Sequence, residues 1–286
     1  MILTIFTSDR FADHLNPPGH PERLERAEVM QVVASEFRQR GGDVREPRAA
    51  TEAELARVHD REYISLVSET AGRATALDAD TFTSPDSYEV ALLAAGAAIA
   101  SVDHVLEAPG RRALAMVRPP GHHAERNRAM GFCLFNNIAI AAAHARARGL
   151  CASPSSTTTC ITATGRSGRF TTTRRSCSSP RINIRITLAQ ARRQKPEQAR
   201  APGSRLTCRL MPGATDADYD VAFETVAFPV LRQFRPELIL ISAGFDALAD
   251  DPLGGMRLSA DQFARLTAAL AAIADECCGG RVVRDH

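Results

Sequence analysis

The feature that most constrains the fold is an alternation of short apolar runs with long alanine-rich stretches. The apolar runs MILTIF (1–6), RALAMV (112–117) and ELILIS (237–242) have the composition of buried parallel strands. Alanine-rich stretches suited to helices occupy 87–106, 137–148 and 259–277. Strands that alternate with helices predict an α/β fold, in which helices cover both faces of a mainly parallel central sheet. We expect the chemistry at the carboxyl ends of the strands.

The size and composition of the chain favour a globular protein. With 286 residues, 44% of them hydrophobic, it can bury a large core, and we expect one domain over residues 1–286. No stretch reaches the roughly 18 uncharged apolar residues of a membrane helix, and the start has no signal-peptide pattern, so we expect a cytoplasmic protein without a membrane partner. The seven cysteines lack paired-ligand spacing, which predicts reduced thiols.

Residues 151–209 differ in kind from the rest of the chain. They carry 11 Arg and one Lys against the single acid Glu197, a charge of +11 in a chain whose total is +2. With almost no apolar periodicity, this aberrant segment is expected to be poorly ordered. Its arginines suit unspecific phosphate contacts. However, Phe170 is its only aromatic residue, which gives no stacking platform, and we expect no nucleic-acid partner.

Polar residues follow two of the predicted strands at the edge where chemistry is expected. The segment RPPGHHA (118–124) presents His122 and His123, and SAGFDALADDP (242–252) presents Asp246. Imidazoles titrate near neutrality, and a nearby carboxylate can divide two of them into a base and an acid. The alternative is a pair of solvated loop histidines and an aspartate that caps a turn.

Five motifs in matching order together resemble the histone deacetylase family, in particular its class II-like and bacterial amidohydrolase members. The motifs are HPERLERA (20–27), VHDREYI (58–64), RPPGHHA (118–124), GFCLFNN (131–137) and SAGFDALADDPLGGM (242–256). The likeness covers residues 1–150 and 211–283. It implies the three-layer arginase/deacetylase α/β/α sandwich. It also implies a hydrolase that uses one zinc ion to remove acetyl or other acyl groups from lysine-like or other small amines.

The resemblance also implies roles for the residues at the strand ends. His122 and His123 resemble the tandem histidines that activate the water and protonate the leaving amine. Asp246 resembles one zinc ligand. A zinc ion suits this chemistry because it polarises the amide carbonyl and lowers the pKa of a bound water to about 7.

Four further residues resemble the substrate-binding part of the family's site. Phe132 resembles a wall of the acyl-lysine tunnel, or is an ordinary core residue, and Gly131 lets the backbone come close. Asp80 resembles a rim carboxylate, or is a helix cap. His20 belongs to the rim loop, or to a simple proline turn. The remaining histidines singled out on helices and turns lack paired carboxylates and are expected to be structural: His59, His104 and His144.

The ligand set implied by the resemblance is incomplete in this sequence. A catalytic zinc takes three protein ligands, and the family's other two come from a D-x-D-x-H-H-G-N-G motif after GFCLFNN. No Asp or His occurs between Cys151 and Arg209. A shifted reading frame explains this, because permitted codons for Ala152–Ser167, read from their third base, spell VAVVDYDVHHGNGTQ. The family's E-G-G-Y segment, whose Tyr stabilises the oxyanion, is also absent after CCGGRVV, and we expect a truncated, inactive chain.

Two other functions are alternatives to this hypothesis. A non-catalytic pseudoenzyme or binding module of the same fold is the main alternative. A ureohydrolase shares the fold but needs two metal ions and a D-x-D pair, and Leu248 stands where the second carboxylate would be. The sequence leaves open the oligomeric state and the choice between acetylated protein lysine and acetylated polyamine.

Overall fold

The structure is a computed structural model that describes residues 2–150, 157–164, 182–190, 205–251 and 254–285, with side chains outside 151–209. The chain divides into two compact units. Of the described residues, the first unit takes 2–145 and 283–285, and the second takes 146–282. Each unit has its own buried apolar clusters.

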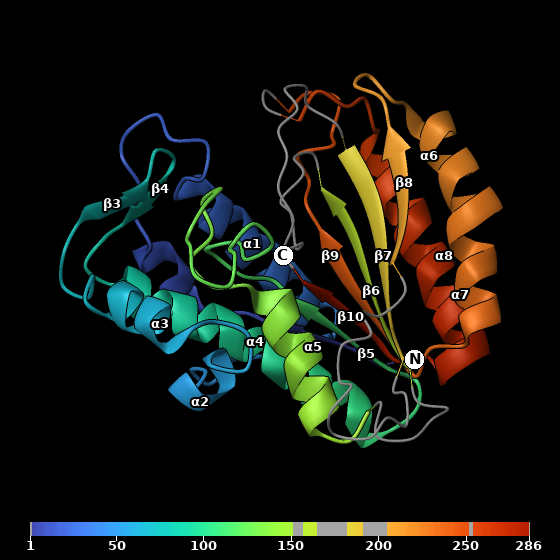
Figure 1. Cartoon of the computed structure of the whole chain (residues 1–286), viewed down its shortest axis with the longest axis horizontal. Coiled ribbons are helices and arrows are strands. Elements are labelled where there is room, and N and C mark those ends of the chain that lie inside the picture. The colour runs from blue at the N-terminus through green and yellow to red at the C-terminus, as the bar shows by residue number, and fades with distance from the viewer. Residues whose placement is uncertain (1, 151–156, 165–181, 191–204, 252–253, 286) are drawn as a thin grey trace, which may run out of the picture. The chain divides into compact units, whose positions relative to one another are not determined.

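The first unit contains a parallel sheet, a separate hairpin and several helices (Figure 1). Its strands are β1 (Ile2–Phe6), β2 (Asp43–Arg45), β5 (Arg111–Ala115) and β10 (Val282–Asp285), and its hairpin is formed by β3 (Thr75–Asp78) and β4 (Thr81–Thr83). Its helices are the 3-10 helix η1 (Asp9–Asp13), α1 (Glu25–Gln39), α2 (Glu52–Leu55), α3 (Arg61–Ser68), α4 (Ser87–Glu107) and α5 (Asn137–Ala147).

Strand β1 explains why helices lie on both faces of this sheet. It pairs in parallel with β2 and with β5. Ile5 packs in a buried cluster with Ala34 of α1. The neighbouring residues Thr4 and Phe6 contact His104 of α4, with 3.0 Å between Thr4 Oγ1 and His104 Nε2 and 6.0 Å between the ring centroids of Phe6 and His104. Because successive strand side chains point to opposite faces, α1 and α4 cover the two faces.

Helix α4 is the one helix of the described residues that is long and apolar enough to cross a membrane by length and composition. The sequence prediction concerned stretches free of charged residues, whereas α4 carries scattered charges such as Glu89 and Asp103. Of its most apolar window, 72% is buried inside the structure. Its residues Ala91, Ala95 and Ile99 belong to a buried cluster that includes α3. Burial within its own unit therefore accounts for the apolar surface of α4.

The second unit combines a sheet with helices that cover β9 (Figure 1). Its strands are β6 (Thr157–Thr164), β7 (Ile182–Gln190), β8 (Arg205–Leu210) and β9 (Leu238–Ala243), and its helices are α6 (Asp216–Ala222), the π-helical turn η3 (Phe223–Ala227), α7 (Phe228–Phe234) and α8 (Ala260–Cys278). Strand β6 pairs in parallel with β9, whereas β6–β7 and β7–β8 are antiparallel. The core contains Ile239 and Ile241 of β9, Leu231 of α7 and Ile273 of α8.

The three predicted strands and the three predicted helices are present as β1, β5, β9, α4, α5 and α8. Local hydrogen bonds explain where two of these helices begin. The Ser259 hydroxyl accepts from Gln262 N at 3.2 Å at the start of α8, and Asn136 Oδ1 accepts from Ala139 N at 3.0 Å at the start of α5. Gly279, with φ 59°, ends α8 in the left-handed conformation that favours glycine.

Strand β6 lies within the segment that the sequence marks as aberrant. Its register with β9 runs from Thr158 opposite Leu238 to Ala163 opposite Ala243. The residues TTTCITAT are rich in β-branched side chains, so the segment keeps a strand propensity although it lacks an apolar run. Strand β7 and residues 205–209 of β8 lie in the same segment, so the expectation of poor order is wrong for all three strands. The rest of the segment, 151–156, 165–181 and 191–204, lies outside the described residues.

Candidate functional site

The predicted histidine pair lies in the loop between β5 and α5 of the first unit. The ring centroids of His122 and His123 are 4.3 Å apart, with 57° between the ring planes. Both side chains are half-buried. Two imidazoles in contact can present a proton acceptor and a proton donor to the same small group, as acid–base catalysis requires.

Residues on either side of the pair fix this loop against α5. A Cβ atom at Gly121 would lie 2.5 Å from Asn137 N and 2.6 Å from Phe135 O, so only glycine fits there. After the pair, Ala124 O accepts from Asn136 Nδ2 at 3.0 Å. Asn136 N in turn donates to Nε2 of His59 at 2.9 Å, and His59 therefore has a structural role.

Gly131 and Phe132 form a tight turn beside the histidine pair. A Cβ atom at Gly131 would lie 2.8 Å from atoms of the His123 side chain. Both residues have positive φ, 58° for Gly131 and 69° for Phe132, and a non-glycine residue pays roughly 1–2 kcal/mol for this conformation. Two hydrogen bonds of 3.1 Å hold the turn, from Gly131 N to Asp80 Oδ1 and from Phe132 N to Thr81 Oγ1.

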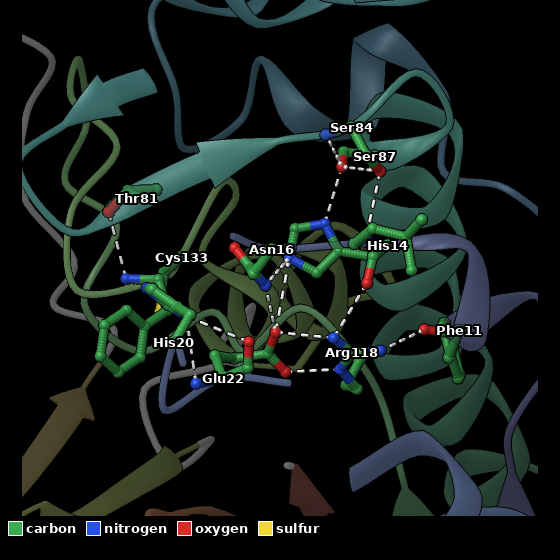
Figure 2. A network of polar contacts seen from close by, with 12 residues as sticks. Phe11, His14, Asn16, His20, Glu22, Thr81, Ser84, Ser87, Arg118 and Cys133 are labelled. Atoms are coloured by element: carbon green, nitrogen blue, oxygen red, sulfur yellow. Dashed lines mark hydrogen bonds and ion pairs between the residues drawn. The ribbon is translucent and has the colours of Figure 1, made fainter. Parts of the chain in front are cut away.

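His20 packs on Phe132 with a defined ring orientation. Its ring centroid lies 4.7 Å from that of Phe132 and 5.5 Å from that of Phe82, both edge to face. His20 Nε2 lies 3.1 Å from Asp80 O, which can only accept, so a ring proton is assigned to Nε2; Nδ1 lies 3.1 Å from Glu22 N and 3.0 Å from Glu22 O. Figure 2 shows His20 next to Glu22 in this network.

The contacts within the first unit bring six of the seven sequence-predicted residues together. They form a chain of contacts from the histidine pair through the Gly131–Phe132 turn to Asp80 and His20. Asp80 directs Oδ1 at Gly131 N, so this oxygen supports the turn. These residues are His122, His123, Gly131, Phe132, Asp80 and His20.

The seventh residue, Asp246, belongs to the second unit and follows β9. Its backbone is closely packed, since a Cβ atom at Gly254 would lie 1.4 Å from Asp246 O. Tyr219 of α6 is buried nearby, and burial, followed by the charge of Asp246, raises the pKa of its hydroxyl. The close approach of the Asp246 backbone to Gly254 explains why the first residue of the GG pair in this motif is glycine.

The described residues do not fit a catalytic zinc ion. Among them, no group of three or more His, Cys, Asp or Glu side chains could hold a metal. A catalytic zinc takes three protein ligands and keeps one open position. The chain between Cys151 and Arg209 contributes neither Asp nor His to such a set.

Sequence reasoning missed three buried residues of this region. Glu22 and Arg118 are both 0% exposed and form a two-point ion pair. Cys133 accepts from His123 N at 3.4 Å and donates to Gly131 O at 3.2 Å, and burial raises the pKa of its thiol to about 12. One sequence signal could have pointed to the ion pair, because each of its residues is a charged residue next to a proline inside a motif. Glu22 follows Pro21, and Arg118 precedes Pro119.

The chain matches one family profile and many known proteins. The profile of the histone deacetylase domain matches residues 20–152 and 189–284. Polyamine deacetylase HDAC10 of Homo sapiens is 34% identical over 297 residues, which cover 91% of this chain and 41% of that protein. The histone deacetylase-like amidohydrolase of Pseudomonas aeruginosa is 34% identical over 288 residues, which cover 96% of this chain and 72% of that protein.

A solved structure supports the fold. The crystal structure of the HDA15 HD domain superposes with a TM-score of 0.75 at 24% identity, covering 99% of this chain and 84% of that one. The predicted α/β class is therefore confirmed, and the family implies zinc. The profile match over most of the sequence carries the assignment: this chain belongs to the histone deacetylase family of metal-dependent amide hydrolases.

Proposed function

We propose that this chain derives from a zinc-dependent deacetylase of acetylated amines and that the 286-residue form has negligible turnover. The observation that carries the proposal is a contrast within the chain. The histidine pair is held in contact beside the Gly131–Phe132 turn, whereas Cys151–Arg209 contains no Asp or His. The residues that would move protons remain, and two of the expected metal ligands do not.

The histidine pair supports the proton transfers of amide hydrolysis. The half-buried rings are in contact, so one can accept the proton of a water molecule while the other donates a proton to the leaving amine nitrogen. Zinc, when bound in the family, polarises the amide carbonyl. Phe132 and His20 offer aromatic edges to the alkyl stem of an acylated amine.

A change of reading phase accounts for the missing ligands. The profile match stops at residue 152 and resumes at 189, inside the segment with a charge of +11. Strand β6 nevertheless pairs with β9, which is the place where a strand-end ligand motif belongs in a parallel sheet. We propose that the bases under Ala152–Arg209 encode this motif in another phase.

Zinc content and hydrolysis test this proposal directly. Purified chain is incubated with zinc and assayed with an acetyl-lysine peptide and with an N-acetylated polyamine, while bound zinc is measured by mass spectrometry. We expect less than one zinc per chain and no hydrolysis above the blank. A chain translated in the shifted phase over 152–209 should gain about one zinc, and changing its restored Asp and His to Ala should remove that zinc. Stoichiometric zinc with rapid turnover in the unaltered chain would overturn the proposal.

A binding module is the second candidate, favoured by the ordered rim. Asp80 and Phe132 are each linked to the others through His20 and the Gly131–Phe132 turn. We propose that this rim retains weak affinity for acylated lysine stems. Titration with an acetyl-lysine peptide, followed by the His20 ring signals, should show saturation. An unacetylated peptide is the matched control, and equal binding of both peptides would exclude this function.

A further inference from the structure

Glu22 and Arg118 form an ion pair that is fully shielded from solvent in the first unit. Arg118 Nε lies 2.5 Å from Glu22 Oε1, and Nη2 lies 2.8 Å from Oε2. Both side chains are 0% exposed. Apolar residues of similar volume often stabilise a protein at least as well as a buried ion pair. A gain in stability therefore does not by itself explain why this pair is present. Its two-point geometry, in contrast, fixes the orientation of the Arg118 side chain.

The remaining donors of Arg118 tie it to the segment after β1. Nη1 donates to Phe11 O at 2.8 Å, and Nη2 donates to His14 O at 2.9 Å. From Arg118 the chain passes through two prolines with restricted φ and through Gly121, which is wedged against α5. His122 follows directly. The direction in which Arg118 is held therefore sets the start of the histidine loop.

The Glu22 carboxylate is held on its other side by neutral groups. Oε2 accepts from Asn16 Nδ2 at 2.7 Å, and Asn16 Nδ2 lies 3.2 Å from His14 Nε2. Nδ1 of His14 lies 2.7 Å from Ser87 Oγ. Burial lowers the pKa of His14 to about 4, so His14 is neutral near pH 7. Arg118 is then the cation that balances Glu22 (Figure 2).

The backbone of the same Glu22 also holds the rim histidine. Its backbone N donates to His20 Nδ1 at 3.1 Å. Its backbone O lies 3.0 Å from the same Nδ1, and on the other side of the ring Nε2 donates to Asp80 O at 3.1 Å. One buried residue therefore contacts the rim through its backbone and the histidine loop through its carboxylate.

We propose that Glu22 and Arg118 are a positioning pair that sets the His20 ring and the His122–His123 loop together. Neither residue needs to touch a substrate for this role, because each acts through the histidines. The inference concerns geometry in the first unit and does not depend on whether the chain binds zinc or turns over a substrate.

Histidine ring signals test the coupling in the chain as it exists. The protein is labelled with ¹⁵N-histidine, and His20→Gln, His122→Gln and His123→Gln variants assign the signals. In Glu22→Gln we expect loss of the protected His20 Nε2–H signal together with displaced His122 and His123 signals. The control is Glu54→Gln, which breaks the two-point pair of Arg48 and Glu54, 2.8 and 2.6 Å, in the same unit. It should leave these histidine signals in place.

Two more variants separate positioning from stability. The double variant Glu22→Met/Arg118→Met removes both charges and should regain thermal stability relative to Glu22→Gln, yet its histidine signals should stay displaced. Arg118→Lys keeps the positive charge but cannot make the two parallel hydrogen bonds to the Glu22 carboxylate. It replaces Glu22→Gln in the comparison if Glu22→Gln does not fold. The proposal fails if the histidine signals return with stability in the double variant, or if the rim and loop signals respond separately.

Discussion

The His123 side chain occupies the space that a side chain at residue 131 would need. The Cβ, Cγ and Cδ2 atoms of His123 all lie 2.8 Å from the position of a Cβ atom on Gly131. Gly131 also has φ 58°, where a Cβ atom is strained. Two independent physical reasons thus require glycine next to the histidine pair.

We expect Gly131→Ala to displace the His123 ring and to destabilise the first unit. Backbone strain of roughly 1–2 kcal/mol adds to overpacking of roughly 1–3 kcal/mol. Urea unfolding followed by circular dichroism measures the loss, and the ¹⁵N signals of His123 report the displacement. Gly72→Ala is the matched control, because Gly72 has φ 75° and open space around it. It should cost only the strain, and an equal loss in both variants would contradict the steric argument.

Cys133 is expected to resist alkylation in the folded protein. Burial raises the pKa of its thiol to about 12, so about one molecule in 10⁴ carries a thiolate at pH 8. Cys277 is partly exposed and should react first with iodoacetamide, as seen by peptide mass spectrometry. In 6 M guanidinium chloride the two should react alike. Modification of native Cys133 at the rate of Cys277 would show that the loop opens easily.

The secondary structure of the first unit follows closely from the sequence, for a physical reason. Thr4–Phe6 of β1 and Ala113 and Ala115 of β5 are buried, although Ile2 and Leu3 at the start of β1 are exposed. The alanine-rich stretch 87–106 is a core helix, so local pattern and burial agree over most of these elements. The contact between the Gly131–Phe132 turn and His123 could not be derived from pattern, because it depends on a positive φ at a phenylalanine. The family resemblance suggested the residues but not this geometry.

The buried charges of the site were the least predictable part. Glu22 and Arg118 are 96 residues apart in the chain. Glutamate and arginine are residue types that are mostly exposed, so the sequence around either one gives no sign of burial. Their burial becomes favourable only when both come together with the carbonyls of Phe11 and His14. Strands β6 and β7 were likewise unexpected; the sequence of β6 lacks an apolar run, but its many β-branched residues favour a strand.

Gly254 of the second unit should tolerate no side chain. A Cβ atom there would lie 1.4 Å from Asp246 O, so Gly254→Ala must push the Asp246 loop away from its position after β9. We expect a loss of several kcal/mol in the unfolding free energy, on the order of the larger overpacking penalties. Gly255→Ala is the neighbouring control, with φ 63° and nothing within 4 Å. If both variants unfold at the same urea concentration, the close approach at Gly254 is wrong.

Asp285 should make the protein less stable as the pH rises from acid to neutral. The residue is 3% exposed, its Oδ1 has no hydrogen-bond partner among the described residues, and burial raises its pKa from 3.8 to about 7. The folded state therefore holds this proton more tightly than the unfolded state, so the favourable term is complete below pH 4 and is lost as the pH rises through 7. The three-unit difference corresponds to about 4 kcal/mol.

Asp285→Asn removes this titration and should therefore stabilise the protein more at pH 8 than at pH 4, by a few kcal/mol. Urea unfolding at both pH values measures the difference. Asp218→Asn is a control of opposite sign, because hydrogen bonds donated by Thr215 lower the pKa of Asp218. The charged Asp218 stabilises the fold above its unfolded pKa, and this contribution is lost as the pH falls. At pH 8 the Asp218→Asn variant should therefore have a lower unfolding free energy than the unaltered chain. An Asp285→Asn protein with the same pH dependence as the unaltered chain would mean that this carboxyl reaches solvent.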